Sequence, residues 1–143
     1  MRYKIIIFLI TQSLFAQSKL FPAEFWKNYT QEQKIAFING AYSAIVKLKS
    51  HHKSEVKKQF IYDDNWVEPY YIKRFYNIAD EYIAEEVGYN IRIIALHIDA
   101  LYSNSHNRLK PVLQALRIVS LMQDGKSEAA NLRLLKAQQK FKN

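Results

Sequence analysis

The sequence predicts an all-α protein, a single compact bundle of four to five helices after an N-terminal signal peptide. Three observations support this fold class. The 143-residue chain has only three glycines and three prolines, so chain breaks are few and helices are long. Apolar residues recur at helical spacing in successive stretches, and no alternating strand pattern of useful length occurs. Hydrophobic residues make up 49 % of the chain, enough for the core of one domain.

The N-terminus has the order of regions typical of a secretory signal. Basic Arg2 and Lys4 precede the mostly apolar run 5–15, and Ala16 offers a small residue before a polar stretch. The apolar run is shorter than the ~20 residues of a transmembrane helix. We expect cleavage after Ala16, with a signal peptide over 1–16, a helical domain over 17–143, and a periplasmic or extracellular location. A retained N-terminal anchor is the alternative.

The first long helix is predicted to begin at Thr30. Thr30 and Gln33 have the spacing of a capping box, and apolar residues continue at helical spacing to Leu48. Gly40 lies inside this helix, where we expect a neighbouring helix or ring to approach closely. Residues 20–29 are expected to pack on the core, with a short helix as one possible form. Residues 50–60 are basic and form either a loop or a short exposed helix.

Three further helices are expected after residues 61–66, which are predicted to form a turn. One begins near Pro69 and ends by Gly88, the next runs from Asn90 to Ser103, and a third reaches Gln123. The polar residues 103–107 favour a tight corner between helices, with Asn107 capping the following helix. A last helix begins at Ser127 and reaches Phe141. Their predicted inward-facing residues include Tyr71, Phe75, Ile78, Tyr82, Ile94, Ile98, Leu113, Leu116 and Ser120. The apolar residues of the last helix are Leu132, Leu134 and Leu135.

Charge and cysteine content limit the partners. The formal charge of +8 favours acidic partners, and export lowers the expectation of nucleic acid. The chain has no cysteine, which excludes thiol catalysis, disulfides, thiolate zinc sites and a lipid anchor on cysteine. We expect no cofactor. The expected partner is another protein of the envelope or a secreted protein, and an anionic membrane surface is the alternative.

The polar residues that could carry catalysis or bind a metal do not form a convergent set in the sequence. His51 and His52 are adjacent, so they point in different directions on a helix, and a metal site with Asp63 or Asp64 is not expected. Four further side chains are the candidates for a small hydrolase, namely Glu81, Glu85, His97 and Asp99. We expect Glu81 and Glu85 to be exposed on the back of their helix, and the protein not to be an enzyme.

The densest aromatic cluster gives the candidate partner surface. Adjacent Tyr70 and Tyr71 cannot both face one core, and Tyr and Trp are enriched at protein interfaces. The alternative is that these rings fill the core and its rim. The candidate surface consists of Trp66, Tyr70, Tyr71, Lys73, Arg74 and Tyr76.

The order of features also resembles a class of small exported bacterial proteins. The matching parts are the signal segment, the stretch from Phe37 to Tyr42, and residues 98–116 as a helix–turn–helix. The class is that of the Tai-type immunity proteins, which act on amidase effectors of type VI secretion. Its members tend to have a Gly-Tyr pair in the early helix, whereas Ala41 separates Gly40 from Tyr42 here. The resemblance implies a periplasmic binding protein without catalysis.

Overall fold

The computed structural model describes residues 20–85 and 90–141, and within them every regular element is helical. The α-helices are α2 (Pro22–Lys27), α3 (Gln31–Gln59), α4 (Tyr70–Asp80), α5 (Ile91–Ser103), α6 (Val112–Gln123) and α7 (Ser127–Lys140). A short 3₁₀ helix, η1 (Ser105–Asn107), follows α5. The predicted all-α bundle is confirmed, and the described residues contain six α-helices because the entry segment forms one. The predicted signal peptide 1–16 and the stop at Gly88 lie outside the described residues.

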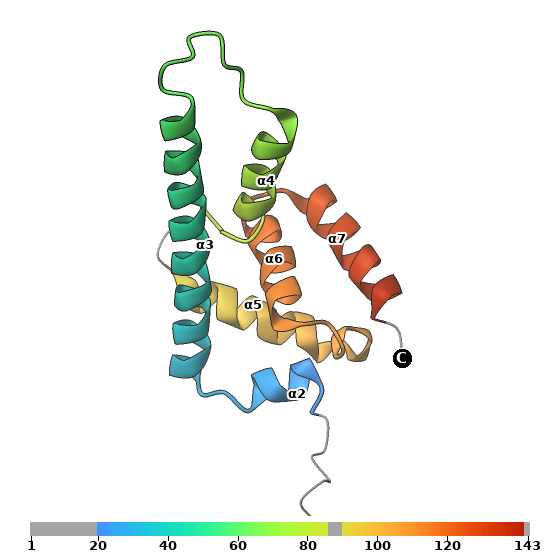
Figure 1. Cartoon of the computed structure of the whole chain (residues 1–143). Coiled ribbons are helices and arrows are strands. Elements are labelled where there is room, and N and C mark those ends of the chain that lie inside the picture. The colour runs from blue at the N-terminus through green and yellow to red at the C-terminus, as the bar shows by residue number, and fades with distance from the viewer. Residues whose placement is uncertain (1–19, 86–89, 142–143) are drawn as a thin grey trace, which may run out of the picture.

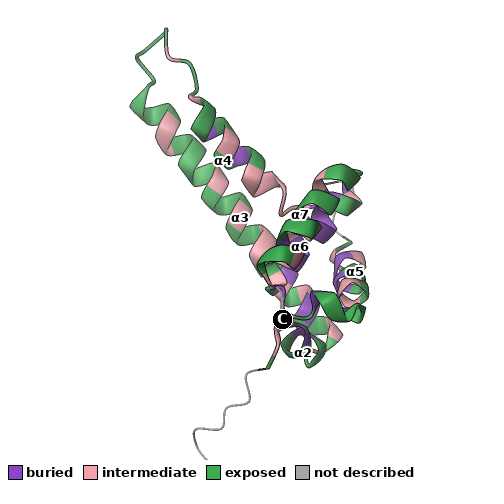
Figure 2. Ribbon diagram, turned by 90° about the vertical axis from the view of Figure 1, so that its right-hand side faces the viewer, coloured by how far each residue is buried: buried purple, intermediate pink, exposed green. Residues whose placement is uncertain are grey.

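The helices form a packed body and a projecting arm (Figures 1 and 2). In the body, α6 packs against α5 and α7, while the first half of α3 packs against α5 and α2 lies beside α6. The second half of α3 leaves this body and runs beside α4 alone (Figure 2). We call residues 46–80 the arm, and residues 60–71, where it turns, the arm end.

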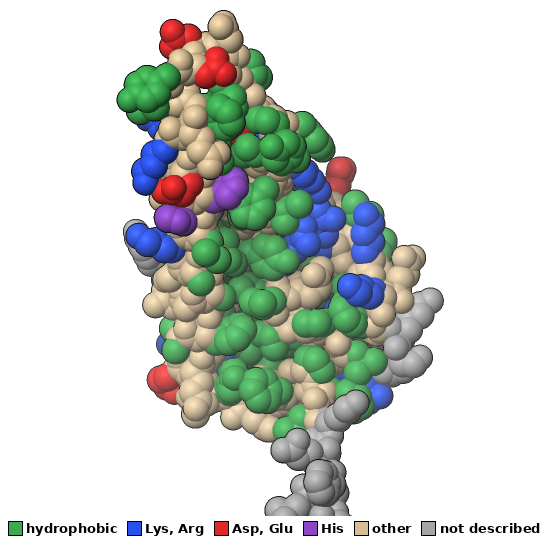
Figure 3. Space-filling model, viewed as in Figure 1, with side chains coloured by type: hydrophobic (Ala, Val, Ile, Leu, Met, Phe, Trp, Pro, Cys, Tyr) green, Lys and Arg blue, Asp and Glu red, His purple; other side chains and the backbone are tan. Residues whose placement is uncertain are grey.

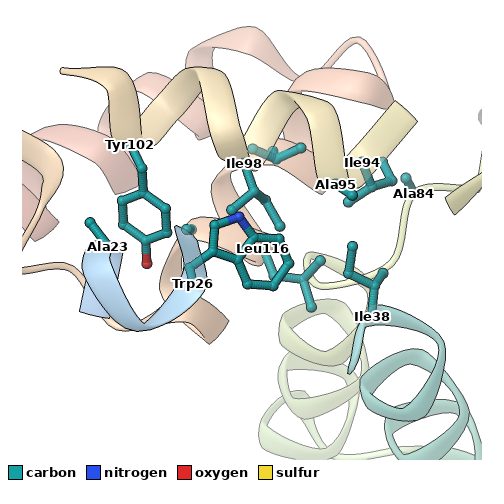
Figure 4. Close-up of a cluster of buried hydrophobic side chains, with 11 residues drawn as sticks. Ala23, Trp26, Ile38, Ala84, Ile94, Ala95, Ile98, Tyr102 and Leu116 are labelled. Atoms are coloured by element: carbon teal, nitrogen blue, oxygen red, sulfur yellow. The ribbon is translucent and has the colours of Figure 1, made fainter. Parts of the chain in front are cut away.

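The core gathers where α2, α3, α5 and α6 meet. The Trp26 side chain is fully buried there, and its indole N–H donates to Asp99 Oδ1 at 2.8 Å. Lys34 also donates to Asp99, at 2.7 Å, so one carboxylate links α2, α3 and α5. Buried apolar residues surround Trp26, including Ala23, Ile38, Ile94, Ile98, Tyr102 and Leu116 (Figure 4).

The ends of α3 show which local predictions hold. Thr30 Oγ1 accepts from the Gln33 N–H at 3.3 Å while Gln33 Oε1 accepts from the Thr30 N–H at 2.9 Å, which confirms the capping box. The helix then continues to Gln59 without a break. Residues 50–59 contain neither Gly nor Pro, and their Lys, Glu and Gln favour helix, so nothing ends it earlier. They belong to this helix, and form neither a loop nor a separate short helix.

The corner between α5 and α6 is confirmed, although its polar contacts differ from those predicted. Asn107 is 3 % exposed, and its amide donates to Leu101 O at 2.8 Å. It therefore satisfies a carbonyl at the end of α5 and does not cap α6. Tyr102 donates to Lys110 O at 2.7 Å, and the buried Lys110 amine donates to His106 O at 2.7 Å. Burial raises the pKa of Tyr102 and lowers the pKa of Lys110.

Candidate functional site

The arm end and the adjoining first turn of α4 expose much of the predicted partner surface. Tyr70 and Tyr71 are 79 % and 71 % exposed, and Lys73 is also exposed. Trp66 is half-buried because it stacks on Phe60, with ring centroids 4.8 Å apart. Arg74 is half-buried, and one of its guanidinium nitrogens lies 3.9 Å from a Glu81 oxygen.

Tyr76 does not belong to this surface. Its side chain is buried between α4 and α3, and its hydroxyl lies 3.0 Å from His52 Nδ1. The rings of His52, Phe75 and Tyr76 contact one another, which fixes α4 along the projecting half of α3. Ile72 and Tyr76 are the buried residues of α4, so the predicted inward face containing Tyr71 and Phe75 is wrong. The reason is that α4 packs on the extension of α3, outside the core.

Residues of the connecting loop extend the apolar surface. Tyr62 is 97 % exposed and Val67 is 82 % exposed, and Ile61 is exposed beside them. A hollow of about 360 Å³ lies next to the Phe60–Trp66 stack, and Lys53 and Lys57 form part of its wall. The prediction of a turn over residues 61–66 did not identify these exposed apolar side chains. The available signal was their apolar content, which is unusual for a loop.

A second apolar feature is a groove where α3, α4 and α6 face one another. Figure 3 shows apolar side chains continuing down this face of the molecule. The groove has a volume of about 400 Å³. Leu48, Phe75 and Leu113 remain 65 %, 45 % and 49 % exposed on its walls, so the predicted burial of Leu113 is wrong. We call it the interhelical groove; its lining residues are Ala41, Ala44, Ile45, Leu48, Lys49, Phe75, Ile78, Ala79, Tyr82 and Leu113.

A charged cluster joins the end of α4 to α6 and α7. The Glu81 carboxylate accepts two hydrogen bonds from Arg133 at 2.8 Å and one from Arg117 Nε at 2.8 Å. Its side chain is only 14 % exposed, so the prediction that Glu81 is an exposed charge is wrong. Burial favours the neutral carboxyl, but the hydrogen bonds and charges of Arg133 and Arg117 outweigh burial and lower the pKa of Glu81.

Beside this cluster lies a basic hollow of about 280 Å³ between α6 and α7. Its charged walls are Arg117, Arg133, Lys136 and Lys140. Lys and Arg side chains gather over this part of the molecule in Figure 3. Tyr82 and Leu113 line both this hollow and the interhelical groove, so the two are contiguous.

The four hydrolase candidates have separate surroundings. Glu81 is held by Arg117 and Arg133, whereas Asp99 is held by Trp26 and Lys34. The His97 ring lies 2.8 Å from Gln123 Nε2, and Glu85 is exposed. The described contacts therefore do not bring these four side chains together.

His51 and His52 likewise do not converge with Asp63 or Asp64. His52 contacts Tyr76, and Asp63 accepts from the backbone N–H of Asn65 at 3.0 Å. Within residues 20–85 and 90–141, no group of three or more His, Asp or Glu side chains could hold a metal ion.

Comparison with protein-family models, curated proteins and solved structures finds no match to this chain. None of the helices in the described ranges combines the length and apolar character needed to span a membrane. The described residues thus form an all-α protein with three surface features, namely an aromatic arm end, an interhelical groove and a neighbouring basic hollow.

Proposed function

We propose that this chain is an exported, non-enzymatic binding protein that docks onto another protein of the envelope or medium through its arm end. The observation that carries the proposal is the set of large apolar side chains exposed together at 60–71. Tyr62, Val67, Tyr70 and Tyr71 are all more than 70 % exposed. Contiguous apolar surface of this kind is typical of interaction sites, and Tyr supplies rigid contact area with a polar tip.

The arm end and its surroundings carry charges of both signs: residues 60–71 contain Asp63, Asp64 and Glu68 and no Lys or Arg, and basic residues flank them. Residues 46–75 contain seven Lys and Arg against four Asp and Glu. Lys53 and Lys57 line the hollow beside the Phe60–Trp66 stack, and Lys73 is exposed one turn from Tyr70. Charges of both signs around aromatic anchors add specificity for a partner surface with the complementary charge pattern. An immunity-like role, with a secreted effector as the partner, is consistent with this arrangement and with the resemblance to Tai-type proteins.

One capture experiment tests both export and binding. The full chain with a C-terminal tag is produced in its own export-competent host and recovered from envelope and medium for mass spectrometry. We expect a chain that begins at Gln17, together with one stoichiometric protein partner. An intact Met1 on the recovered chain would contradict export by cleavage. If no protein were captured and the chain bound anionic vesicles in a salt-sensitive manner, the partner would be a membrane surface and not a protein.

A matched pair of variants locates the binding surface. Tyr70→Ser with Tyr71→Ser removes two exposed rings from the arm end, and we expect it to abolish capture of the partner. Leu132→Ser with Leu135→Ser removes two exposed apolar side chains from α7 and should leave capture unchanged. Equal capture by both double variants would show that the partner binds elsewhere.

A further inference from the structure

The interhelical groove is a different surface from the arm end, and its lining is almost entirely apolar. Lys49 is its one charged lining residue, and the amine of Lys49 is paired with Asp80. The other lining residues are Ala, Ile, Leu, Phe and Tyr. Ala41, Ala44 and Ala79 contribute small side chains to the wall, which leaves space that longer side chains would fill. The described chain leaves this surface open, although burying it would be favourable.

The groove has the length and volume of a small-ligand site. It follows α3 from Ala41 to Lys49, a length of about 12 Å at the helical rise per residue. Its volume of about 400 Å³ lies within the range of small-ligand sites. A single hydrocarbon chain lying along α3 would bury this apolar lining.

The end of the groove at Tyr82 and Leu113 opens into the basic hollow. There a single carboxylate, Glu81, faces the guanidiniums of both Arg117 and Arg133. Lys136 and Lys140 add two further positive charges, and neither makes an ion pair with any side chain in the described part of the protein. The hollow therefore carries a surplus of positive charge and is complementary to an anion.

We propose that the interhelical groove and the basic hollow together bind a single-chain anionic amphiphile, a long-chain carboxylate. The hydrocarbon chain lies along α3 between Ala44 and Phe75. The carboxylate lies beyond Tyr82 and accepts from Lys136 and Lys140. The positive charge at one end of the site and the mostly apolar lining along the rest favour this ligand over a neutral hydrocarbon and over a short anion.

The test is calorimetric titration of the full chain with octanoate, decanoate and dodecanoate below their micelle concentrations, and with the alcohols of the same lengths. We expect affinity to rise by up to roughly fifteenfold for each added pair of methylene groups. We expect each alcohol to bind at least roughly tenfold more weakly than its carboxylate, because it lacks the charge-assisted contact. Equal affinity of alcohol and carboxylate would overturn the proposed role of the basic hollow.

Two variants with matched controls separate the chain site from the head-group site. Ala44→Phe fills the groove and should abolish binding of dodecanoate, whereas Ala36→Phe on an exposed position of α3 outside the groove should not. Lys136→Gln with Lys140→Gln should weaken the carboxylate to the level of the alcohol, and Lys53→Gln with Lys57→Gln should not. Binding that survives Ala44→Phe, or binding of the protein to anionic vesicles but not to any monomeric carboxylate, would overturn the proposal. Because the arm end is intact in these groove variants, their result is independent of partner capture.

Discussion

Glu81 directly follows α4 and connects the arm to the body, at the opposite end of the arm from the arm end. Its carboxylate receives hydrogen bonds from one arginine on α6 and one on α7. Arg117 also lies over the Tyr82 ring, with its guanidinium carbon 5.2 Å from the ring centroid. The three side chains are between 14 % and 18 % exposed, so removing the carboxylate would leave two partly buried positive charges without their counter-charge.

Substitution of this residue should make stability depend on pH in a defined way. Glu81→Gln should lower the free energy of unfolding by about 2–3 kcal/mol at pH 7. The folded pKa of Glu81 lies below its ordinary value of 4.5, so its contribution is fully present above about pH 4.5 and is lost as the pH falls through the folded pKa. Urea unfolding at several pH values should therefore show the difference between wild type and variant shrinking in acid.

The neighbouring Glu85 provides the control for this experiment. Glu85 is exposed, so Glu85→Gln should change the free energy of unfolding by no more than about 0.5 kcal/mol. If the two variants had the same pH dependence, the Arg117–Glu81–Arg133 cluster would not be the source of the effect.

A second residue-scale network secures the segment that follows α4. The Tyr42 hydroxyl accepts from the Ala84 N–H at 3.2 Å and lies 2.8 Å from Ser120 Oγ. Ser120 Oγ donates to Tyr82 O at 3.0 Å, so its one proton is committed and Tyr42 must donate to it. Burial of this hydroxyl raises the pKa of Tyr42. The predicted inward position of Ser120 thus carries a polar contact with Tyr42 that helical spacing does not show.

At the scale of helices, the two described glycines have opposite roles. Gly40 lies in the middle of α3, and a Cβ added there would meet nothing within 4 Å. The expected close approach of a neighbour at Gly40 is therefore wrong. Gly125 has φ +68° and ends α6, where Lys126 N–H donates to Leu121 O and Gly125 N–H donates to Met122 O. This is a Schellman motif, which requires the left-handed conformation that glycine adopts readily.

Alanine should consequently stabilise one helix and destabilise the other. Gly40→Ala should raise the free energy of unfolding by about 0.5–1 kcal/mol, because alanine loses less backbone entropy than glycine in a helix. Gly125→Ala should lower it by about 1 kcal/mol, because the left-handed conformation is strained for an L side chain. Thermal unfolding of both variants gives the comparison. Loss of stability in Gly40→Ala would mean that a neighbouring group packs against that position.

At the scale of the molecule, the arm and the body differ in how much they bury. The body contains the fully buried Trp26, Ile38, Ile98 and Leu116, whereas the arm is held mainly through Ile72, Tyr76 and their contacts with α3. Segments with few buried apolar contacts open at lower free energy than a core. The proposed partner surface thus lies on the part of the molecule that opens most easily.

Rates of amide hydrogen exchange should distinguish the arm from the body. Tyr76→Ala should speed amide exchange in α4 and in residues 50–59 while leaving α5 and α6 unchanged, because it removes the ring packed against His52. Leu116→Ala removes a fully buried side chain and should cost about 2–5 kcal/mol, which speeds exchange in the body as well. Equal acceleration throughout the chain in both variants would show that the arm and the body unfold as one unit.

The sequence by itself determined several helix boundaries, but not the end of α3 at Gln59 or the end of α4 at Asp80. The capping box at Thr30, the corner at 103–107 and the stop at Gly125 depend on residues a few positions apart, so their geometry is visible in the chain order. It also indicated that Tyr70 and Tyr71 cannot share one core, and both are exposed. Helical spacing further placed Ile94, Ile98 and Leu116 in the core correctly.

Only the tertiary structure decided which face of each helix is covered and by what. Tyr76 is buried and Phe75 lines the groove because α4 packs on the extension of α3, a placement that no periodicity within α4 specifies. Glu81 is held by two arginines that lie 36 and 52 residues away in sequence. The interhelical groove combines residues from three helices. Such sites depend on how the helices pack against one another. The sequence pattern indicates only which residues lie on each face of a helix.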